Sequence, residues 1–165
     1  VYSKVVACID SVLRGFNATV FCYGQTATGK SHTMFGADSS HHNNRTFISN
    51  ESGIVPRSVS RIFSQLQMLG EGSTCDVEVY VSFMQIYNDQ IYDLFNDPFL
   101  SNPLEIRRED TVHSTHHRSN DVFIAGLSEY SVKTSDECLR ILKIGLDNRS
   151  IRETRMNAAS SRSHS

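Results

Sequence analysis

Hydrophobic side chains in several segments recur at three- and four-residue intervals, which is the spacing of one helix face. Val5, Ile9 and Val12 form such a stripe, and Gly15 behind them suits a left-handed helix end. Further along, Pro56 suits the opening turn of a helix, and Thr134 with Glu137 forms a capping pair. The pattern therefore predicts helices over 2–14, 30–36, 56–69 and from the capping pair to about 151.

Other segments are continuously apolar or alternate between apolar and polar side chains, as strands do. Residues 19–23 (TVFCY) are β-branched and aromatic, so we expect a buried strand there. Residues 77–87 carry one strongly apolar face, and two later runs flank a His-rich stretch as hairpin arms would. Strands are therefore expected over 19–23, 77–87, 90–95, 104–108 and 122–127.

Helical and strand periods alternate along the 165 residues, which favours a single mixed α/β domain or a large piece of one. Sixteen Lys and Arg and eighteen Asp and Glu side chains give a net charge of −2, so no nucleic-acid partner is expected. Any other polyanionic partner would have to bind a local patch of positive charge. No apolar run approaches the roughly 18 residues of a membrane span. Without CxxC spacing, free, buried cytosolic thiols are expected at Cys8, Cys22, Cys75 and Cys138, with disulfides as the less favoured alternative.

The clearest chemical signal is the run from Gly24 to Ser31, which fits G-x-x-x-x-G-K-[ST] between an expected strand and an expected helix. Glycines allow backbone N–H groups to converge on phosphates, and the positive helix end adds to the attraction. Lys30 is expected to reach the β- and γ-phosphates, and Ser31 to hold Mg²⁺. The motif predicts nucleoside triphosphate binding.

A second polar run extends from Asn157 to His164, behind the last expected helix. Alone, such a run is typical of a solvated loop. Beside a phosphate cradle, its hydroxyls and its arginine have the chemistry to close over a γ-phosphate, complete a Mg²⁺ shell and position water.

These two runs resemble the nucleotide loop and switch I of the kinesin motor domain. Residues 53–57 (GIVPR) and 82–94 (SFMQIYNDQIYDL) resemble further kinesin segments in the family's order, so the resemblance spans the whole chain. It implies a three-layer α/β fold of the P-loop NTPase class, with a mostly parallel central sheet flanked by helices. It also implies that 1–165 is a partial motor domain, from the phosphate loop through switch I, without the first strand, switch II and the neck.

The resemblance implies an ATP-dependent microtubule motor of the cytoplasm and cytoskeleton, with ATP and Mg²⁺ as cofactors and hydrolysis in the complete parent protein. His32 resembles the residue that packs on adenine, Arg162 the partner of a switch II glutamate, and Ser31 and Ser160 the ligands of Mg²⁺. The catalytic residues would be Asn157, Ser160, Ser161 and Arg162. The cofactor-binding residues would be Gly24, Gln25, Thr26, Ala27, Thr28, Gly29, Lys30, Ser31 and His32.

Three positions differ from the residues that are usual in the family: this chain has Ala27 where Gly is frequent, Ser31 where Thr is frequent, and Gln85 where Glu is common. Serine keeps the hydroxyl for Mg²⁺, whereas Gln85 removes a charge from an expected buried network. Residues 105–127 match the family hairpin that touches tubulin, although a solvated loop is the alternative because acidic residues dilute its charge. The basic and titratable side chains there are Arg107, Arg108, His113, His116, His117 and Arg118.

Two other function classes stay open at this point. A module derived from a motor could bind nucleotide or microtubules without hydrolysis. A kinase or GTPase with the same phosphate loop is disfavoured, because the run from Asn157 to His164 fits neither class.

Overall fold

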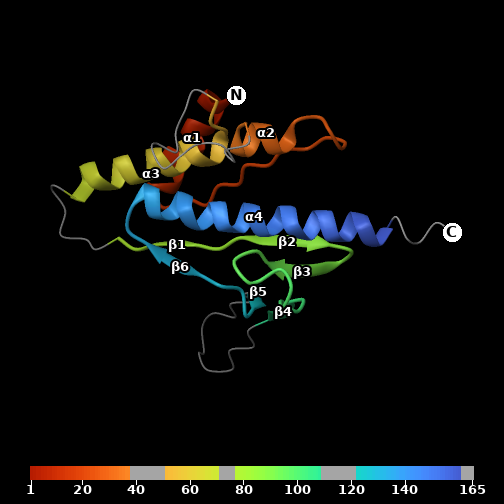
Figure 1. The fold of residues 1–165 in the computed structure, drawn as a ribbon. Helices are drawn as coiled ribbons and strands as arrows, with labels where there is room; N and C mark the ends of the chain where they lie inside the picture. Colours follow the sequence, from red (N-terminus) through yellow and green to blue (C-terminus); the bar gives the residue numbers. More distant parts are fainter. Residues whose placement is uncertain (38–50, 71–76, 109–121, 161–165) are drawn as a thin grey trace. The chain divides into compact units, whose positions relative to one another are not determined.

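The computed structural model describes residues 1–37, 51–70, 77–108 and 122–160 (Figure 1). The chain divides into two compact units, which are described separately. The first unit comprises Val1–Glu78 and Lys133–Leu139, and the second comprises Val79–Val132 and Arg140–Ser165. Among the described residues, no helix is both long enough and apolar enough to cross a bilayer.

Helices dominate the first unit, and the three that the hydrophobic spacing predicts there are confirmed. Val5 and Ile9 face Ile54 across the packed helices and form the buried core, which Met34 and Ile62 flank. Burying such side chains stabilises the unit by about 1.5–3 kcal/mol each. The helices are α1 (Tyr2–Val12), α2 (Lys30–Phe35) and α3 (Ile54–Gly70).

The strand expected over 19–23 is absent, so that prediction is wrong for this structure. The segment has no regular secondary structure and pairs with no described strand, and Phe21 and Tyr23 are 80% and 96% exposed. A strand requires a neighbour to satisfy its backbone N–H and C=O groups. The β-branched and aromatic residues of 19–23 are therefore not sufficient to form a strand. Within the described residues, no other strand lies beside this segment to pair with it.

Two glycines bring the end of α2 against the start of α3. Gly36 forms an antiparallel bridge with Ser52, and Gly36 has a φ of 98°. A Cβ on Gly53 would lie 2.5 Å from the carbonyl oxygen of Met34, which no side chain tolerates. This backbone contact fixes α2, and with it the preceding loop, against the helical core.

Three two-stranded sheets form the second unit together with most of a long helix. All their pairings are antiparallel, so the mostly parallel order expected for the central sheet is not found among the described strands. The hairpin arms expected around the His-rich stretch are confirmed. The pairs are β1 (Val79–Val81) with β6 (Tyr130–Val132), β2 (Met84–Tyr87) with β3 (Gln90–Asp93), and β4 (Glu105–Arg108) with β5 (Val122–Ala125).

The single strand expected over 77–87 is interrupted at Ser82 and Phe83. Before the interruption β1 pairs with β6, and after it β2 pairs with β3. The Phe83 carbonyl still accepts a hydrogen bond from Leu94 N at 2.9 Å. The apolar alternation correctly predicts an extended chain, but the change of partner divides it into two strands.

The last helix, α4 (Ser135–Ser160), runs along the strands of the second unit in Figure 1. Thr134 Oγ1 accepts a hydrogen bond from Glu137 N at 3.1 Å, while the Glu137 carboxylate accepts one from Lys133 N at 2.7 Å. The predicted cap is thus present, but the Glu137 carboxylate accepts its hydrogen bond from Lys133 N, one residue before the Thr134 N–H that it contacts in a standard capping box. The helix continues beyond 151 because no Gly or Pro interrupts it after Gly145.

Cys8, Cys22 and Cys138 are free, as expected, and Cys75 lies outside the described residues. The expected burial is wrong for Cys8 and Cys22, which are partly exposed. Cys138 on α4 is buried. Burial, and secondly the negative charge of Glu137, raise the pKa of the Cys138 thiol. A thiol with this environment stays protonated and weakly nucleophilic at neutral pH.

Candidate functional site

The Gly-rich loop ahead of α2 turns through left-handed backbone conformations. Gly24, Ala27 and Gly29 have φ angles of 156°, 66° and 85°. A Cβ on Gly24 would lie 2.6 Å from Thr28 Oγ1, so the loop closes on itself only with glycine there. Ala27 pays about 1 kcal/mol for a conformation that glycine adopts without strain.

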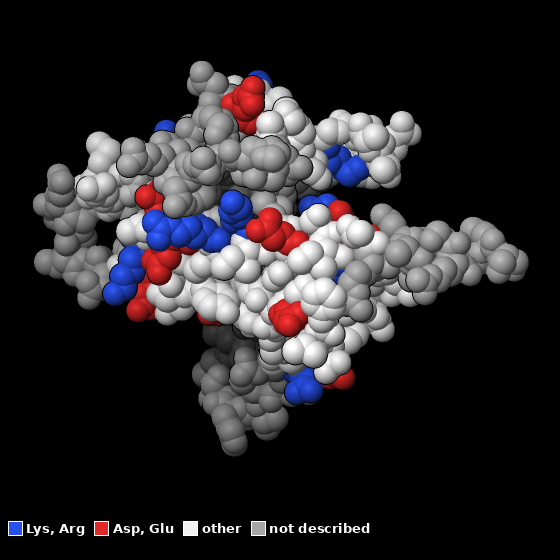
Figure 2. Space-filling model, viewed as in Figure 1, with Lys and Arg blue, Asp and Glu red and all other residues white. Residues whose placement is uncertain are grey.

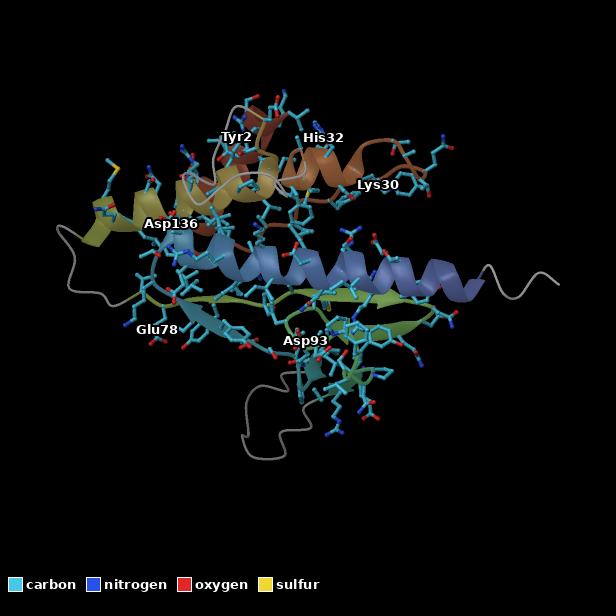
Figure 3. All side chains as sticks on the ribbon, in the orientation of Figure 1. Tyr2, Lys30, His32, Glu78, Asp93 and Asp136 are labelled. Atoms are coloured by element: carbon cyan, nitrogen blue, oxygen red, sulfur yellow. The ribbon has the colours of Figure 1, made fainter. Side chains whose placement is uncertain are left out.

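Lys30 lies where the loop meets α2, as Figure 3 shows. Its Nζ donates hydrogen bonds to the carbonyl oxygens of Gly24 and Gln25, both at 2.7 Å. Thr28 Oγ1 donates to the same Gln25 oxygen at 2.8 Å. The ammonium group is therefore held at the loop itself and not extended into solvent, which places a positive charge where the motif requires it.

The rest of the loop is open to solvent. Residues 25–29 are exposed, and so are Ser31 and His32 at the start of α2. The Thr33 N–H donates to Gly29 O at 2.8 Å, whereas helix geometry leaves the amide groups before it without acceptors inside the helix. A phosphate can therefore reach backbone donors, the Lys30 ammonium and the Ser31 hydroxyl, and these donors fit a nucleoside triphosphate with Mg²⁺.

The switch I candidates lie at the end of α4 or beyond it. Asn157 and Ser160 belong to its last turns, so the expectation that a loop begins at Asn157 is wrong for this structure. Helix-favouring residues between 152 and 159 account for the extension. Ser161 and Arg162 lie outside the described residues. The structure brings the phosphate-loop residues together in the first unit and Asn157 with Ser160 in the second.

The two arms expected for the basic hairpin pair as β4 and β5; β4 is exposed throughout, whereas Ile124 and Ala125 of β5 are partly buried. Arg107 pairs with Glu105 of the same strand at 3.1 Å, and Arg108 is exposed beside it. Figure 2 shows acidic side chains interspersed with basic ones on the visible face. His113, His116, His117 and Arg118 lie outside the described residues.

Gln85, where kinesins commonly have Glu, lies on β2 opposite Tyr92 of β3. Its Oε1 is buried and accepts no hydrogen bond within the part of the chain that the structure describes. Sequence reasoning identified the departure but missed three residues by which α4 contacts the strands and their connecting segments: Gly145 through close apolar contact, and Asn148 and Arg152 through hydrogen bonds. Their spacing of three and four residues continues the helix stripe of Cys138 and Leu142, and this was the available signal.

A family model described as the kinesin motor domain matches residues 1–165. The kinesin-like protein Klp61F of Drosophila melanogaster is 35% identical over 165 residues, 99% of this chain and 14% of its own length. The kinesin-like protein KIF11-A of Xenopus laevis is 39% identical over 166 residues, 100% of this chain and 15% of its own length.

A solved structure of a fast kinesin superposes with a TM-score of 0.74 at 31% identity. The match covers 93% of this chain and 38% of that chain. The mixed helix and sheet architecture is therefore that of a P-loop NTPase, although the chain spans only a small part of its curated relatives. The chain belongs to the kinesin motor-domain family.

Proposed function

We propose that the complete protein is an ATP-dependent microtubule motor, which binds and hydrolyses ATP with Mg²⁺. The observation that carries this proposal is the Lys30 ammonium held 2.7 Å from two loop carbonyls at the start of α2. Neutral carbonyls are weaker partners for an ammonium than phosphate oxygens are. A bound triphosphate would therefore draw Lys30 from the loop carbonyls to the β- and γ-phosphates.

The remaining loop residues orient the nucleotide in this proposal. Residues 24–29 supply backbone N–H groups, Ser31 supplies a hydroxyl ligand for Mg²⁺, and His32 lies against the adenine. Mg²⁺ neutralises charge that develops on the phosphates during transfer. Ser160 would be the second hydroxyl of the metal site.

The catalytic contribution of this chain would come from the end of α4 and the residues after it. Asn157, Ser160, Ser161 and Arg162 supply amide, hydroxyl and guanidinium groups that can position water and stabilise the transition state. Interactions of this kind act on turnover more than on ground-state binding.

Microtubule contact is proposed for the hairpin of 105–127, through Arg107, Arg108 and Arg118. Its exposed arms offer both positive charge and apolar side chains, since Ile106 and Val122 are 63% and 60% exposed. The proposal implies that the parent protein acts on microtubules in the cytoplasm.

The substitution Lys30→Ala in the complete motor tests the nucleotide site. Removing the ammonium should weaken binding of a fluorescent ATP analogue about 10- to 100-fold, because hydrogen bonds to charged groups contribute about 1.5–3 kcal/mol. Lys4→Ala, at an exposed position of α1, is the matched control and should leave the affinity unchanged. Equal affinities for the two variants would refute the assigned site.

Phosphate release by the unsubstituted motor, with and without microtubules, separates a motor from a module that only binds. Microtubule-stimulated release supports the proposed function. Nucleotide binding without any release would instead establish the non-hydrolysing alternative.

A further inference from the structure

A charged side chain is buried in the second unit. Arg152 of α4 is only 5% exposed. Its guanidinium carbon lies 4.7 Å from the ring centroid of Tyr92 on β3, and its Nη2 donates a hydrogen bond to Ser101 Oγ. Cation–π contacts of a desolvated guanidinium are stronger than exposed ones. Arg152 thus ties α4 to β3 and to the segment between β3 and β4.

Two further contacts lie on the same face of α4, at helical spacing. Asn148 Nδ2 donates to the carbonyl oxygens of Leu94 at 2.8 Å and Asn96 at 3.3 Å. Gly145 lies so close to Phe83 that a Cβ would be 2.4 Å from its ring. Apolar packing alone tolerates small rotations and sliding, whereas directional hydrogen bonds to fixed acceptors do not. These contacts define the rotation and the axial position of α4.

We propose that Arg152 is a positioning residue for switch I, a role that rests on the proposed function. At 1.5 Å per residue, Asn157 lies about 7.5 Å and Ser160 about 12 Å further along the axis of α4. A continuous helix carries the position set at Arg152 to these residues, since α4 is unbroken to Ser160. Loss of the anchor would misplace the groups that act on the γ-phosphate and leave the phosphate loop intact.

The same contact also lies beside the proposed microtubule hairpin. Ser101 precedes Leu104, whose N–H donates to Ile91 O at 2.7 Å, and β4 follows directly. Arg152 is therefore held on one side by the segment that leads into the hairpin. Microtubule-stimulated turnover should depend on Arg152 at least as strongly as basal turnover does.

The test compares Arg152→Ala, Arg152→Lys and Arg140→Ala in the complete motor, since Arg140 is exposed on the same helix and serves as the matched control. Arg152→Ala should lower microtubule-stimulated kcat about tenfold, because small misplacement of catalytic groups is costly. Its affinity for a fluorescent ATP analogue should stay within about twofold of the unsubstituted motor. Arg152→Lys should restore part of kcat, and Arg140→Ala should change neither quantity.

Ser101→Ala removes the hydroxyl that accepts the Arg152 hydrogen bond and creates no large cavity. This variant therefore tests the positioning role if Arg152→Ala does not fold. It should lower kcat in the same direction, with unchanged nucleotide affinity. An unchanged kcat in a folded Arg152→Ala, or in Ser101→Ala where the former is unfolded, would overturn the positioning role. A parallel loss of kcat and affinity would also overturn it. An unsubstituted motor without ATPase activity would instead contradict the proposed function itself.

Discussion

At the scale of single residues, one carboxylate joins two distant parts of the second unit. Asp93 is 1% exposed at the end of β3, where Figure 3 labels it. Its Oδ1 accepts a hydrogen bond from Phe95 N at 2.8 Å, and its Oδ2 accepts bonds from Ser128 N at 2.9 Å and Asn96 Nδ2 at 3.2 Å. The carboxylate therefore holds both the turn after β3 and the segment after β5.

Asp93→Asn should destabilise the complete motor by about 2–3 kcal/mol, because the new amide places a donor against a backbone N–H and removes charge-assisted bonds. Denaturant unfolding measures the difference. Asp89→Asn is the control, because Asp89 is exposed at a left-handed turn position that asparagine also tolerates. Equal unfolding midpoints for the two variants would contradict the structural role of Asp93.

The sequence predicts some of these residues far better than others. The loop of residues 24–31 is predictable because its signal is a local motif, and Lys30 contacts the carbonyl oxygens of that same loop. Asp93 and Arg152 carry no such local signal, since a polar residue in a strand or a helix is usually solvated. Their burial depends on partners at least 35 positions away, such as Ser128 for Asp93 and Ser101 for Arg152.

At the scale of elements, α4 depends on one residue without a side chain. Phe83 and Phe95 pack edge to face, with ring centroids 6.2 Å apart, and Phe95 contacts Tyr130 in the same way at 5.3 Å. Gly145 lets α4 approach this aromatic cluster closely. Glycine lowers the helix propensity at this position of α4, but it allows the helix to approach these aromatic side chains closely.

Gly145→Ala should lower the stability of the complete motor, although alanine favours helices by about 1 kcal/mol over glycine. The added methyl group would overlap the Phe83 ring, and overpacking costs about 1–3 kcal/mol. Ser150→Ala, at an exposed position of the same helix, should be neutral or slightly stabilising. Thermal unfolding decides, and a higher melting temperature for Gly145→Ala would refute the close contact.

The sequence predicts a helix or strand well where the spacing of its own residues is enough to form it. It predicts a strand poorly where the strand depends on which other strand pairs with it. The spacing of Val5 and Ile9 is sufficient for α1, and the two arms of the β4–β5 hairpin are neighbours by virtue of their connection. Residues 19–23 and 77–87 depend on which strands lie beside them, and this information is not present in the segments themselves.

At the scale of the whole molecule, the positive and negative side chains of this chain nearly cancel. The net charge is −2, and both signs are mixed on the face shown in Figure 2. Long-range attraction to a negatively charged filament cannot come from the net charge. The contribution of this chain to the proposed microtubule contact therefore has to come from local charge, such as the arginines of the hairpin.

Neutralising Arg107, Arg108 and Arg118 together should weaken microtubule binding by the complete motor and reduce its dependence on salt, because exposed charges are screened. Arg108→Ala alone should weaken binding more than Arg107→Ala alone, since Glu105 already pairs with Arg107. Co-sedimentation at two ionic strengths measures both effects, with Arg14→Ala, at an exposed position in the turn after α1, as the control. A triple variant with unchanged affinity and salt response would show that the hairpin is only a solvated connection.

The bridge between Gly36 and Ser52 has a consequence for how this region can be engineered and how it can diverge. The two ends of the intervening stretch are joined by backbone contact, so α2 and α3 do not depend on its length for their mutual placement. Each doubling of such a stretch costs only about 0.6 kcal/mol in closure entropy. Insertions between Gly36 and Ser52 should therefore accumulate at little thermodynamic cost, and a reporter peptide placed between these two residues should leave the helical core intact.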